Sequence, residues 1–438
     1  MTTGAYLPGF GNQFTSEAVP GALPQGRNSP QRPPLGLYAE LISGSAFTAP
    51  RAHNQRSWVY RRQPSVVGGA YATYAQPYWK SGAAGGEHAP PDPLRWRPLP
   101  LPDAPLDFID GMRTLVVAGD PDAQCGLAAH VALMNRSMER RALVNADGEM
   151  LIVPQLGELT LVTEFGVLDV APGEIALLPR GVAFSVQVQG PSRAYVCENY
   201  GAPLRLPELG PIGSNGLAAA RDFLAPVAAF DAQQAGDYRM VRKCGGQLWQ
   251  ATQPRTPFDV VAWHGNLAPF KYDTANFMVL GSVSFDHPDP SIFTVLSSPS
   301  DTPGSANCDF VIFPPRWSVA DDTFRPPWYH RNVMSEFMGL VRGRYDAKPS
   351  GFEPGGASLH GAMVPHGPDA EAFAAASSAP LVPQRLDDTL AFMFESRWRM
   401  RPTAFALRGG ALDDGYADCW AGLDDRFEQG PAAGGCAA

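Results

Sequence analysis

The chain has 438 residues, of which 45% are hydrophobic, and a formal net charge of −9. This is the composition of a globular protein with room for two or three cores, and without a basic stripe it does not favour a nucleic acid as a partner. No apolar run nears the roughly 18 residues of a membrane-spanning helix, and the first residues, MTTGAYLPGF, do not resemble a signal peptide. We therefore expect a cytoplasmic location away from membranes.

Glycine and proline are unusually frequent, with 45 and 44 residues. Both disfavour helix interiors and mark turns, so they predict many short strands joined by long loops. The six cysteines are scattered and form no CxxC pair. In a chain of this length they indicate free thiols in a reducing compartment.

Along the chain, residues 1–50 predict an extended arm with turns, not a packed unit, which would lie over another subunit or domain. Residues 112–190 hold short apolar or alternating segments separated by Gly or Pro, which is typical of an antiparallel sandwich or barrel. Residues 216–231 could carry a short helix. A second β-rich region spans 259–402, with a clear helix predicted at 369–379.

Gly173, Pro179 and Gly181 are spaced as in the second sequence motif of cupins, jelly-roll barrels that often hold a metal ion. Metal-binding cupins have a histidine where this chain has Phe184. No H-x-H precedes it in residues 147–166. The first β region is therefore expected to form a cupin-like barrel without a metal.

The second β region contains His330, Asn332, Glu336 and Gly343, which resemble the first cupin motif, H-x-H-x3-E-x6-G, with Asn332 in the second histidine position. Offsets of 0, 2 and 6 share one face of a strand. A continuous strand would separate His330 from Glu336 by roughly 20 Å, too far for two ligands of one ion. We therefore expect the chain to break near Met334–Ser335, or Glu336 to lie on a neighbouring strand.

A third candidate ligand is His366, which lies between Pro365 and Gly367 in a Gly/Pro-rich loop. Two neutral imidazoles and one carboxylate would leave Fe(II) with open positions for a substrate oxygen and O2. Zinc with the same ligands would favour hydrolysis instead. The other histidines considered are interpreted as ordinary core or surface residues; they are His53, His88, His130 and His264.

Several long strings resemble the homogentisate 1,2-dioxygenase family from about Tyr6 to about Arg401. They include GFGNQFTSEAVPGALPQGRNSPQ, FDHPDPSIFTVL, RPPWYHRNVMSEFMGLVRGRYDAK and GFEPGGASLHGAMVPHGPDA. The resemblance implies a mainly β fold with two jelly-roll, cupin-like barrel units, long loops and few helices. A larger N-terminal domain would span 1–275, and a smaller C-terminal domain, 276–438, would carry iron.

The resemblance also implies the site and the reaction. Fe(II) would be held by His330, Glu336 and His366, and His287 would be the catalytic base. Tyr345, His366 and His360 would border the substrate. The enzyme would convert homogentisate and O2 to 4-maleylacetoacetate in tyrosine and phenylalanine catabolism, as a homohexamer built from two trimers.

Other interpretations stay open at this point. The chain could cleave another dihydroxy-aromatic acid such as gentisate, act as a non-catalytic double cupin, or be a zinc or manganese isomerase. His287 could simply be a turn residue, because Asp286, Pro288 and Asp289 surround it. Tyr345 could be a strand residue that faces the barrel wall.

Overall fold

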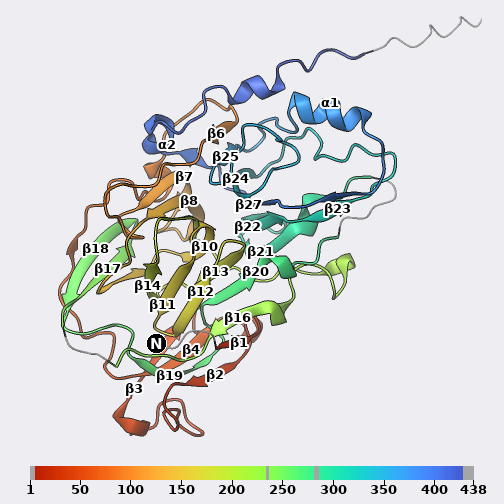
Figure 1. Ribbon diagram of the computed structural model, residues 1–438. Coiled ribbons are helices and arrows are strands. Elements are labelled where there is room, and N and C mark those ends of the chain that lie inside the picture. The colour runs from red at the N-terminus through yellow and green to blue at the C-terminus, as the bar shows by residue number, and fades with distance from the viewer. Residues whose placement is uncertain (1–4, 233–235, 281–285, 428–438) are drawn as a thin grey trace, which may run out of the picture.

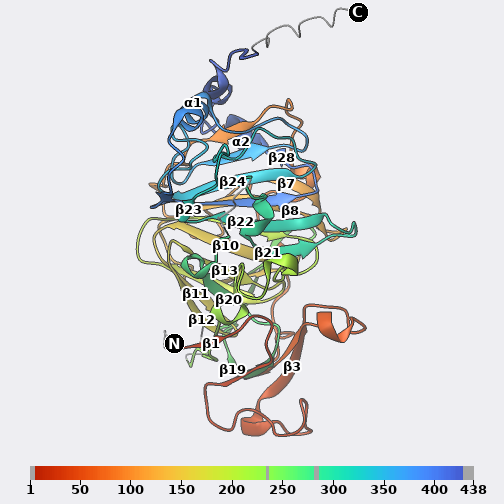
Figure 2. The same cartoon turned by 90° about the vertical axis from the view of Figure 1, so that its right-hand side faces the viewer.

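The computed structural model describes residues 5–232, 236–280 and 286–427. The chain is mainly β, and its sheets are stacked into an elongated body (Figures 1 and 2). Among the described residues there are two α-helices, α1 (Ala370–Ser378) and α2 (Ala404–Arg408). The prediction of a mainly β protein with few helices is confirmed. No helix in the described ranges is long and apolar enough to cross a membrane.

The N-terminal unit contains two large sheets that face each other. Their inner sides enclose an apolar cluster that includes Leu143, Ile152, Leu161 and Phe184. The nine-stranded sheet has the order β1 (Tyr6–Pro8), β16 (Phe223–Pro226), β20 (Phe270–Asp273), β13 (Glu174–Leu178), β10 (Glu149–Leu156), β15 (Ser192–Asn199), β8 (Cys125–Met134), β7 (Met112–Asp120), β28 (Arg401–Pro402). The seven-stranded sheet has the order β12 (Gly166–Val170), β11 (Leu159–Thr163), β14 (Ala183–Val188), β9 (Arg141–Asn145), β17 (Tyr238–Cys244), β18 (Gln247–Gln253), β5 (Ala72–Thr73).

The motif that predicted this barrel lies at its strand connections. Gly173 directly precedes β13 and Gly181 lies between β13 and β14, with φ angles of 100° and 86°. Only glycine adopts such angles without steric cost, which explains the residue type at these two turns. Phe184 is buried and packs edge-on against Phe108, with ring centroids 5.9 Å apart.

The C-terminal unit is built on a six-stranded sheet, and its strands alternate between two environments. Phe310, Phe392 and Phe394 point towards the nine-stranded sheet and join the core that contains Tyr195 of β15. Residues one position along each strand point the other way, into a cavity. The sheet has the order β21 (Thr294–Pro299), β22 (Ala306–Phe313), β27 (Leu390–Ser396), β24 (Ser335–Arg342), β25 (Ala357–His360), β6 (Leu94–Trp96).

The two units exchange edge strands. β6, from residues 94–96, pairs with β25 in the C-terminal sheet, and β28, from residues 401–402, pairs with β7 in the N-terminal sheet. The Oη of Tyr195 also donates to the carbonyl of Gly356 at 2.6 Å. The predicted boundary between residues 275 and 276 stays a prediction.

Residues 5–50 are more closely packed than the sequence suggested, so the expectation of an arm that is not a packed unit is wrong for much of this segment. β1 joins the nine-stranded sheet, and two further strands join a four-stranded sheet that projects from the body in Figure 2. Leu37, Tyr60 and Val261 form a small core beneath it. This sheet has the order β2 (Phe14–Glu17), β19 (Val260–Gly265), β4 (Arg56–Arg61), β3 (Tyr38–Ser43), and a separate pair is formed by β23 (Arg316–Ser318) and β26 (Gln384–Leu386).

The two helix predictions had different outcomes. The helix predicted at 369–379 is α1, and the carboxylate of Asp369 caps it by accepting from the amide of Ala372 at 2.7 Å. Residues 216–231 contain only a 3-10 turn, Ala220–Asp222, followed by β16. Strand pairing outweighs helix propensity there, because Phe223 is paired across the sheet with Tyr272.

Candidate metal centre

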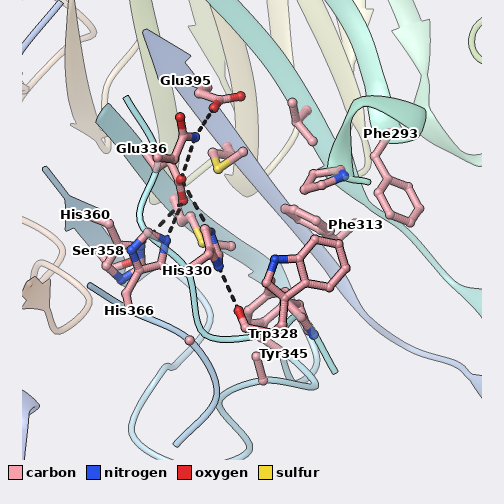
Figure 3. A pocket seen from close by; sticks show the side chains of 18 of the residues that line it. Phe293, Phe313, Trp328, His330, Glu336, Tyr345, Ser358, His360, His366 and Glu395 are labelled. Carbon is pink, nitrogen blue, oxygen red and sulfur yellow. Dashed lines mark hydrogen bonds and ion pairs between the residues drawn. The ribbon is translucent and has the colours of Figure 1, made fainter. Parts of the chain in front are cut away.

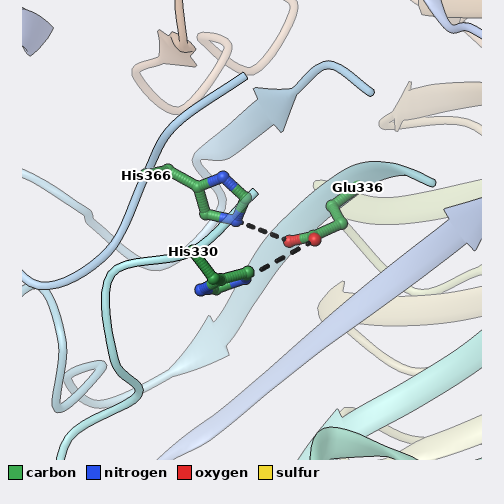
Figure 4. Close-up of side chains that lie close together, drawn as sticks. All are labelled: His330, Glu336 and His366. Atoms are coloured by element: carbon green, nitrogen blue, oxygen red, sulfur yellow. Dashed lines mark hydrogen bonds and ion pairs between the residues drawn. The ribbon is translucent and has the colours of Figure 1, made fainter. Parts of the chain in front are cut away.

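Three of the predicted residues converge at one point on the cavity side of the C-terminal sheet (Figure 4). Each of His330, Glu336 and His366 offers one ligand atom, and these atoms all lie within 4.8 Å of one another. The Nε2 of His366 is 3.0 Å from Oε2 of Glu336, and the Nε2 of His330 is 3.8 Å from Oε1. Both His366 and Glu336 are buried.

The backbone shows how residues at offsets 0 and 6 reach one point. His330 lies outside the main sheet and forms an isolated antiparallel bridge with His366. The chain then bends at Val333 and Met334, and β24 begins at Ser335. The break expected near Met334–Ser335 is therefore present, and Glu336 is the second residue of the strand that follows it.

Each of these two histidines is oriented by its other ring nitrogen. The Nδ1 of His330 lies 2.8 Å from the carbonyl of Trp328, and the Nδ1 of His366 lies 2.9 Å from the carbonyl of Val364. A carbonyl only accepts, so Nδ1 carries the proton in the neutral ring and Nε2 keeps its lone pair. Metal-binding histidines are typically held in this way.

The carboxylate between them is held in its charged form. Burial raises the pKa of Glu336, but the nearby imidazoles of His330, His360 and His366 together outweigh it, and the pKa lies well below its ordinary value. The Glu336 carboxylate in turn raises the pKa of His330. Two nitrogen lone pairs directed at a buried anion form a donor set that fits a divalent metal ion.

A row of polar side chains, level with Glu336, crosses four neighbouring strands of the sheet. Asp309 of β22 is opposite Glu395 of β27, Glu395 is opposite Glu336 of β24, and Glu336 is opposite His360 of β25. Burial raises the pKa of Glu395 to about 7, and it also raises the pKa of Asp309. The amide of Asn332 donates to Glu336 and to Glu395, and so lies between these two carboxyl groups.

These side chains line one part of a cavity of about 590 Å³, a volume common for small-molecule sites. In Figure 3 the imidazoles of His360 and His366 lie on one side of the pocket, and Phe293, Phe313 and Trp328 lie on the other. The cavity is therefore polar near the histidines and aromatic opposite them, which suits a flat ring with polar substituents.

The predicted residues His287 and Tyr345 also line this cavity. The ring of His287 packs edge-on against Trp328 with centroids 5.3 Å apart, and its Nδ1 is 2.8 Å from the carbonyl of Pro288. That contact leaves Nε2 of a neutral His287 able to accept a proton. Tyr345 is buried between Phe313 and Phe352, and burial raises the pKa of its hydroxyl.

His360 lies directly behind His366, and the two rings are stacked at 4.1 Å. Its Nε2 is 3.0 Å from the hydroxyl of Tyr416, while its buried Nδ1 has no hydrogen-bond partner and lies 3.9 Å from Glu336. Burial lowers the pKa of His360 to about 4, so the ring is neutral. Tyr416 belongs to a 3-10 turn near the C-terminus, Tyr416–Trp420, and nothing in its local sequence pointed to this contact.

Four cations line the cavity, and they differ in how they are paired. Arg316 is paired with Asp346 at 2.7 Å, Arg95 is paired with Asp413 at 2.6 Å, and Arg331 is exposed. Lys348 is buried, and its pKa is lowered by burial. Among the described residues no carboxylate lies within 4.0 Å of its ammonium group. Its contacts include the thiol of Cys419 at 3.5 Å, the ring of Trp420 at 4.2 Å and the ring of Tyr416 at 5.4 Å. Lys348 is thus the buried cation best placed to meet an anion in the cavity.

A β unit with two imidazoles and one carboxylate gathered at the wall of a cavity belongs to the class of metal-binding, cupin-like proteins. Comparison with known proteins narrows this class. A family model described as the N-terminal part of homogentisate 1,2-dioxygenase matches residues 5–274, and a model of the C-terminal part matches residues 275–427. The chain belongs to the homogentisate 1,2-dioxygenase family.

Curated proteins named homogentisate 1,2-dioxygenase align with this chain over almost their whole length. The protein named homogentisate 1,2-dioxygenase from Rhodopseudomonas palustris is 57% identical over 97% of this chain and 95% of its own. Those from Nitrobacter hamburgensis and Bradyrhizobium diazoefficiens are 57% and 56% identical, over 97% and 98% of this chain and 95% and 96% of their own.

Solved structures similar to this chain are distant. Protein Ylba from E. coli has a TM-score of 0.33 and 8% identity over 72% of this chain and 95% of its own. A protein from Shewanella frigidimarina with a cupin-2 domain has a TM-score of 0.16 and 14% identity over 17% of this chain and 70% of its own.

Proposed function

We propose that this protein is a homogentisate 1,2-dioxygenase. It opens the aromatic ring of homogentisate with both atoms of O2 to give 4-maleylacetoacetate, a step of tyrosine and phenylalanine catabolism. The observation that carries the proposal is the convergence of His330, Glu336 and His366 at a cavity, in a chain 57% identical to proteins of that name.

The metal in this proposal is Fe(II), held by His330, Glu336 and His366. Bound there, it would supply unpaired electrons that overcome the spin barrier to the reaction of O2 with an aromatic ring, together with open positions for ligands. The donor set supports this assignment, because two imidazoles and one carboxylate neutralise only part of the charge of a divalent ion.

His287 is the proposed general base. Its Nδ1 is oriented towards the carbonyl of Pro288, which leaves Nε2 to accept a proton from a substrate hydroxyl or to hydrogen-bond it. Tyr345 and His360 are proposed to border the ring, with the hydroxyl of Tyr345 fixing its orientation and His366 contacting the substrate from the metal side.

Homogentisate carries an acetate arm, so the site needs a group that meets a carboxylate. Lys348 is the best candidate, because the arginines in the wall are paired with Asp346 and Asp413 or exposed. A buried ammonium without a carboxylate partner gains most from an incoming anion. This contact would also distinguish homogentisate from an uncharged diphenol.

The decisive experiment loads the protein with Fe(II) under anaerobic conditions and follows oxygen uptake after homogentisate is added. Gentisate and an uncharged diphenol serve as parallel substrates, and metal analysis separates an iron enzyme from a zinc or manganese isomerase. Rapid uptake with homogentisate and formation of the ring-opened product are expected. Absence of uptake by the fully iron-loaded protein would refute the proposal.

We also propose a cytoplasmic homohexamer made of two trimers, with domains at 1–275 and 276–438. The projecting four-stranded sheet supports an assembly, because Tyr38, Phe47 and Val66 on and beside it are exposed in the single chain. Light scattering coupled to gel filtration would give the mass of the assembly. A monomeric mass across the working concentration range would overturn the proposal of a hexamer.

A further inference from the structure

Asn332 lies directly behind the carboxylate of Glu336. Its Nδ2 donates to Oε1 of Glu336 at 3.0 Å and to Oε1 of Glu395 at 2.6 Å. A side-chain amide nitrogen carries two hydrogens, so both of them are used on these two carboxyl groups. Asn332 therefore connects Glu336 to Glu395 on the neighbouring strand.

The amide of Asn332 is itself fixed. Its Oδ1 accepts from the backbone amide of Met334 at 2.8 Å, and its backbone carbonyl accepts from the amide of Met363 at 2.6 Å. The opposite amide orientation would place Oδ1 against two carboxyl oxygens and Nδ2 against an N–H donor. The contacts therefore define one orientation, and they tie the loop before Glu336 to the loop before His366.

The Asn332 amide lies between the carboxyl groups of Glu336 and Glu395. Glu336 and Glu395 are opposite each other on β24 and β27, and like charges in that position repel. The donor between them keeps Oε1 of Glu336 occupied, while Oε2 faces His366 at 3.0 Å. Carboxylates that bind metals are commonly held by such outer hydrogen bonds.

We propose that Asn332 is a positioning residue that fixes the Glu336 carboxylate for metal binding and, because it replaces a cupin histidine, limits the protein ligands to three. An amide nitrogen has no lone pair for a metal, and the amide oxygen is turned towards Met334. The inference rests on the proposed function, because it requires a metal at His330, Glu336 and His366.

The first test compares the iron-loaded protein with its Asn332→Asp variant, which keeps the side-chain shape but loses the donor. The readout is the rate at which Fe(II) passes to a colorimetric chelator. Loss of an outer hydrogen bond is expected to speed release about 10- to 100-fold, and the exposed Asn276→Asp serves as a matched control with the wild-type rate. Release within about twofold of the wild-type rate would overturn the inference.

The same experiment distinguishes a failure of the proposed function from a failure of the role inferred for Asn332. Failure of the wild-type protein to bind Fe(II) counts against the proposed function, whereas equal release by wild type and variant counts against Asn332 alone. Thermal unfolding of the metal-free proteins is measured alongside. A lower unfolding temperature of the Asn332→Asp protein combined with unchanged release would assign Asn332 a purely structural role and overturn the inference.

The second test is Asn332→His, which restores the residue found in metal-binding cupins. With Co(II) as a spectroscopic probe, the visible spectrum before substrate addition is expected to change as the imidazole becomes a fourth protein ligand. The KM for homogentisate of the iron-loaded variant is expected to rise, because one open position is lost. A spectrum and a KM identical to those of the wild type would overturn the limit of three ligands.

Discussion

The hydroxyl of Tyr416 lies 3.0 Å from Nε2 of His360, and both side chains are buried. The two residues come from different parts of the C-terminal unit, since β25 ends at His360 and Tyr416 begins a 3-10 turn near the end of the described chain. The C-terminal segment therefore contributes directly to the wall behind the metal site.

Tyr416→Phe removes this hydrogen bond without changing the shape of the wall. The His360 ring then has no polar partner at either nitrogen, because its Nδ1 already has none. A neutral hydrogen bond is worth about 1 kcal/mol, so turnover is expected to fall about fivefold, with iron content retained. Steady-state kinetics with iron analysis of the same samples checks this, and unchanged turnover would show that Tyr416 does not orient His360.

Glu336→Gln is expected to abolish metal binding, because an amide replaces the anion in the ligand set. Fe(II) at about 100 times its Kd would stabilise the wild-type protein by about 2.7 kcal/mol, which raises its unfolding temperature. The variant is expected to show no such rise under the same anaerobic conditions. A rise equal to that of the wild type would mean that the ion binds elsewhere.

His287→Ala is expected to lower the rate of turnover without lowering the iron content of the protein. Loss of a general base typically costs about 10²- to 10⁴-fold in rate, and His287 is not among the three convergent ligands. Iron content should therefore match the wild type while kcat falls within that range. The exposed His88→Ala is the control. Simultaneous loss of iron and turnover would make His287 a structural residue.

Lys348→Met tests the group proposed to meet the acetate arm. A hydrogen bond to a charged group is worth about 1.5–3 kcal/mol, so KM for homogentisate should rise about 10- to 150-fold. The activity towards an uncharged diphenol should change little. Lys80→Met, at an exposed position, is the control. An unchanged KM for homogentisate in the Lys348→Met variant would show that another residue binds the substrate carboxylate.

The pH dependence of stability is expected to reflect Glu198, which is fully buried in the N-terminal unit. Burial raises its pKa, but Lys243, 3.3 Å away, together with His130 and Trp79 outweighs that effect, and the pKa falls from its ordinary value of 4.5 to about 2. A depressed pKa stabilises the folded state above the ordinary value. That contribution is lost as the pH falls from about 4.5 towards 2.

Glu198→Gln should therefore be less stable than the wild type at pH 7, by on the order of 3 kcal/mol. The difference should narrow below pH 4.5, where the wild type loses the same contribution. Denaturant titrations from pH 7 down to about pH 2.5 measure it, with the exposed Glu158→Gln as a control. A difference that does not depend on pH in this range would contradict the role given to the Glu198 charge.

The sequence predicted local features well and distant contacts poorly. Spacing identified His330, Glu336 and His366, because the motif requires a side chain of each type on one face and a bend between them. It could not reveal that the bend is stabilised by a backbone bridge between His330 and His366, since 36 residues separate these positions. The contact between His330 and His366 arises from tertiary pairing, and such pairing leaves no signal in the local sequence.

Tyr416 and Lys348 show the same limit. Tyr416 lies in none of the quoted strings, and Lys348 ends one of them without an assigned role. Their importance follows from where the folded chain buries them, beside His360 and in the cavity wall. The arm at residues 1–50 was misjudged for a related reason. Gly and Pro mark turns correctly, but they do not show that β2 and β3 find pairing partners in β19 and β4, more than a strand length away in sequence.

The exchange of edge strands makes each half of the chain dependent on the other. A fragment beginning at residue 276 would lack β6, and the open edge of β25 would be free to pair with another molecule. A fragment ending at residue 275 would lack β28 and leave β7 exposed in the same way. Separately expressed halves would therefore expose these edges and aggregate, and the unit with the candidate metal site depends on a strand from the N-terminal half.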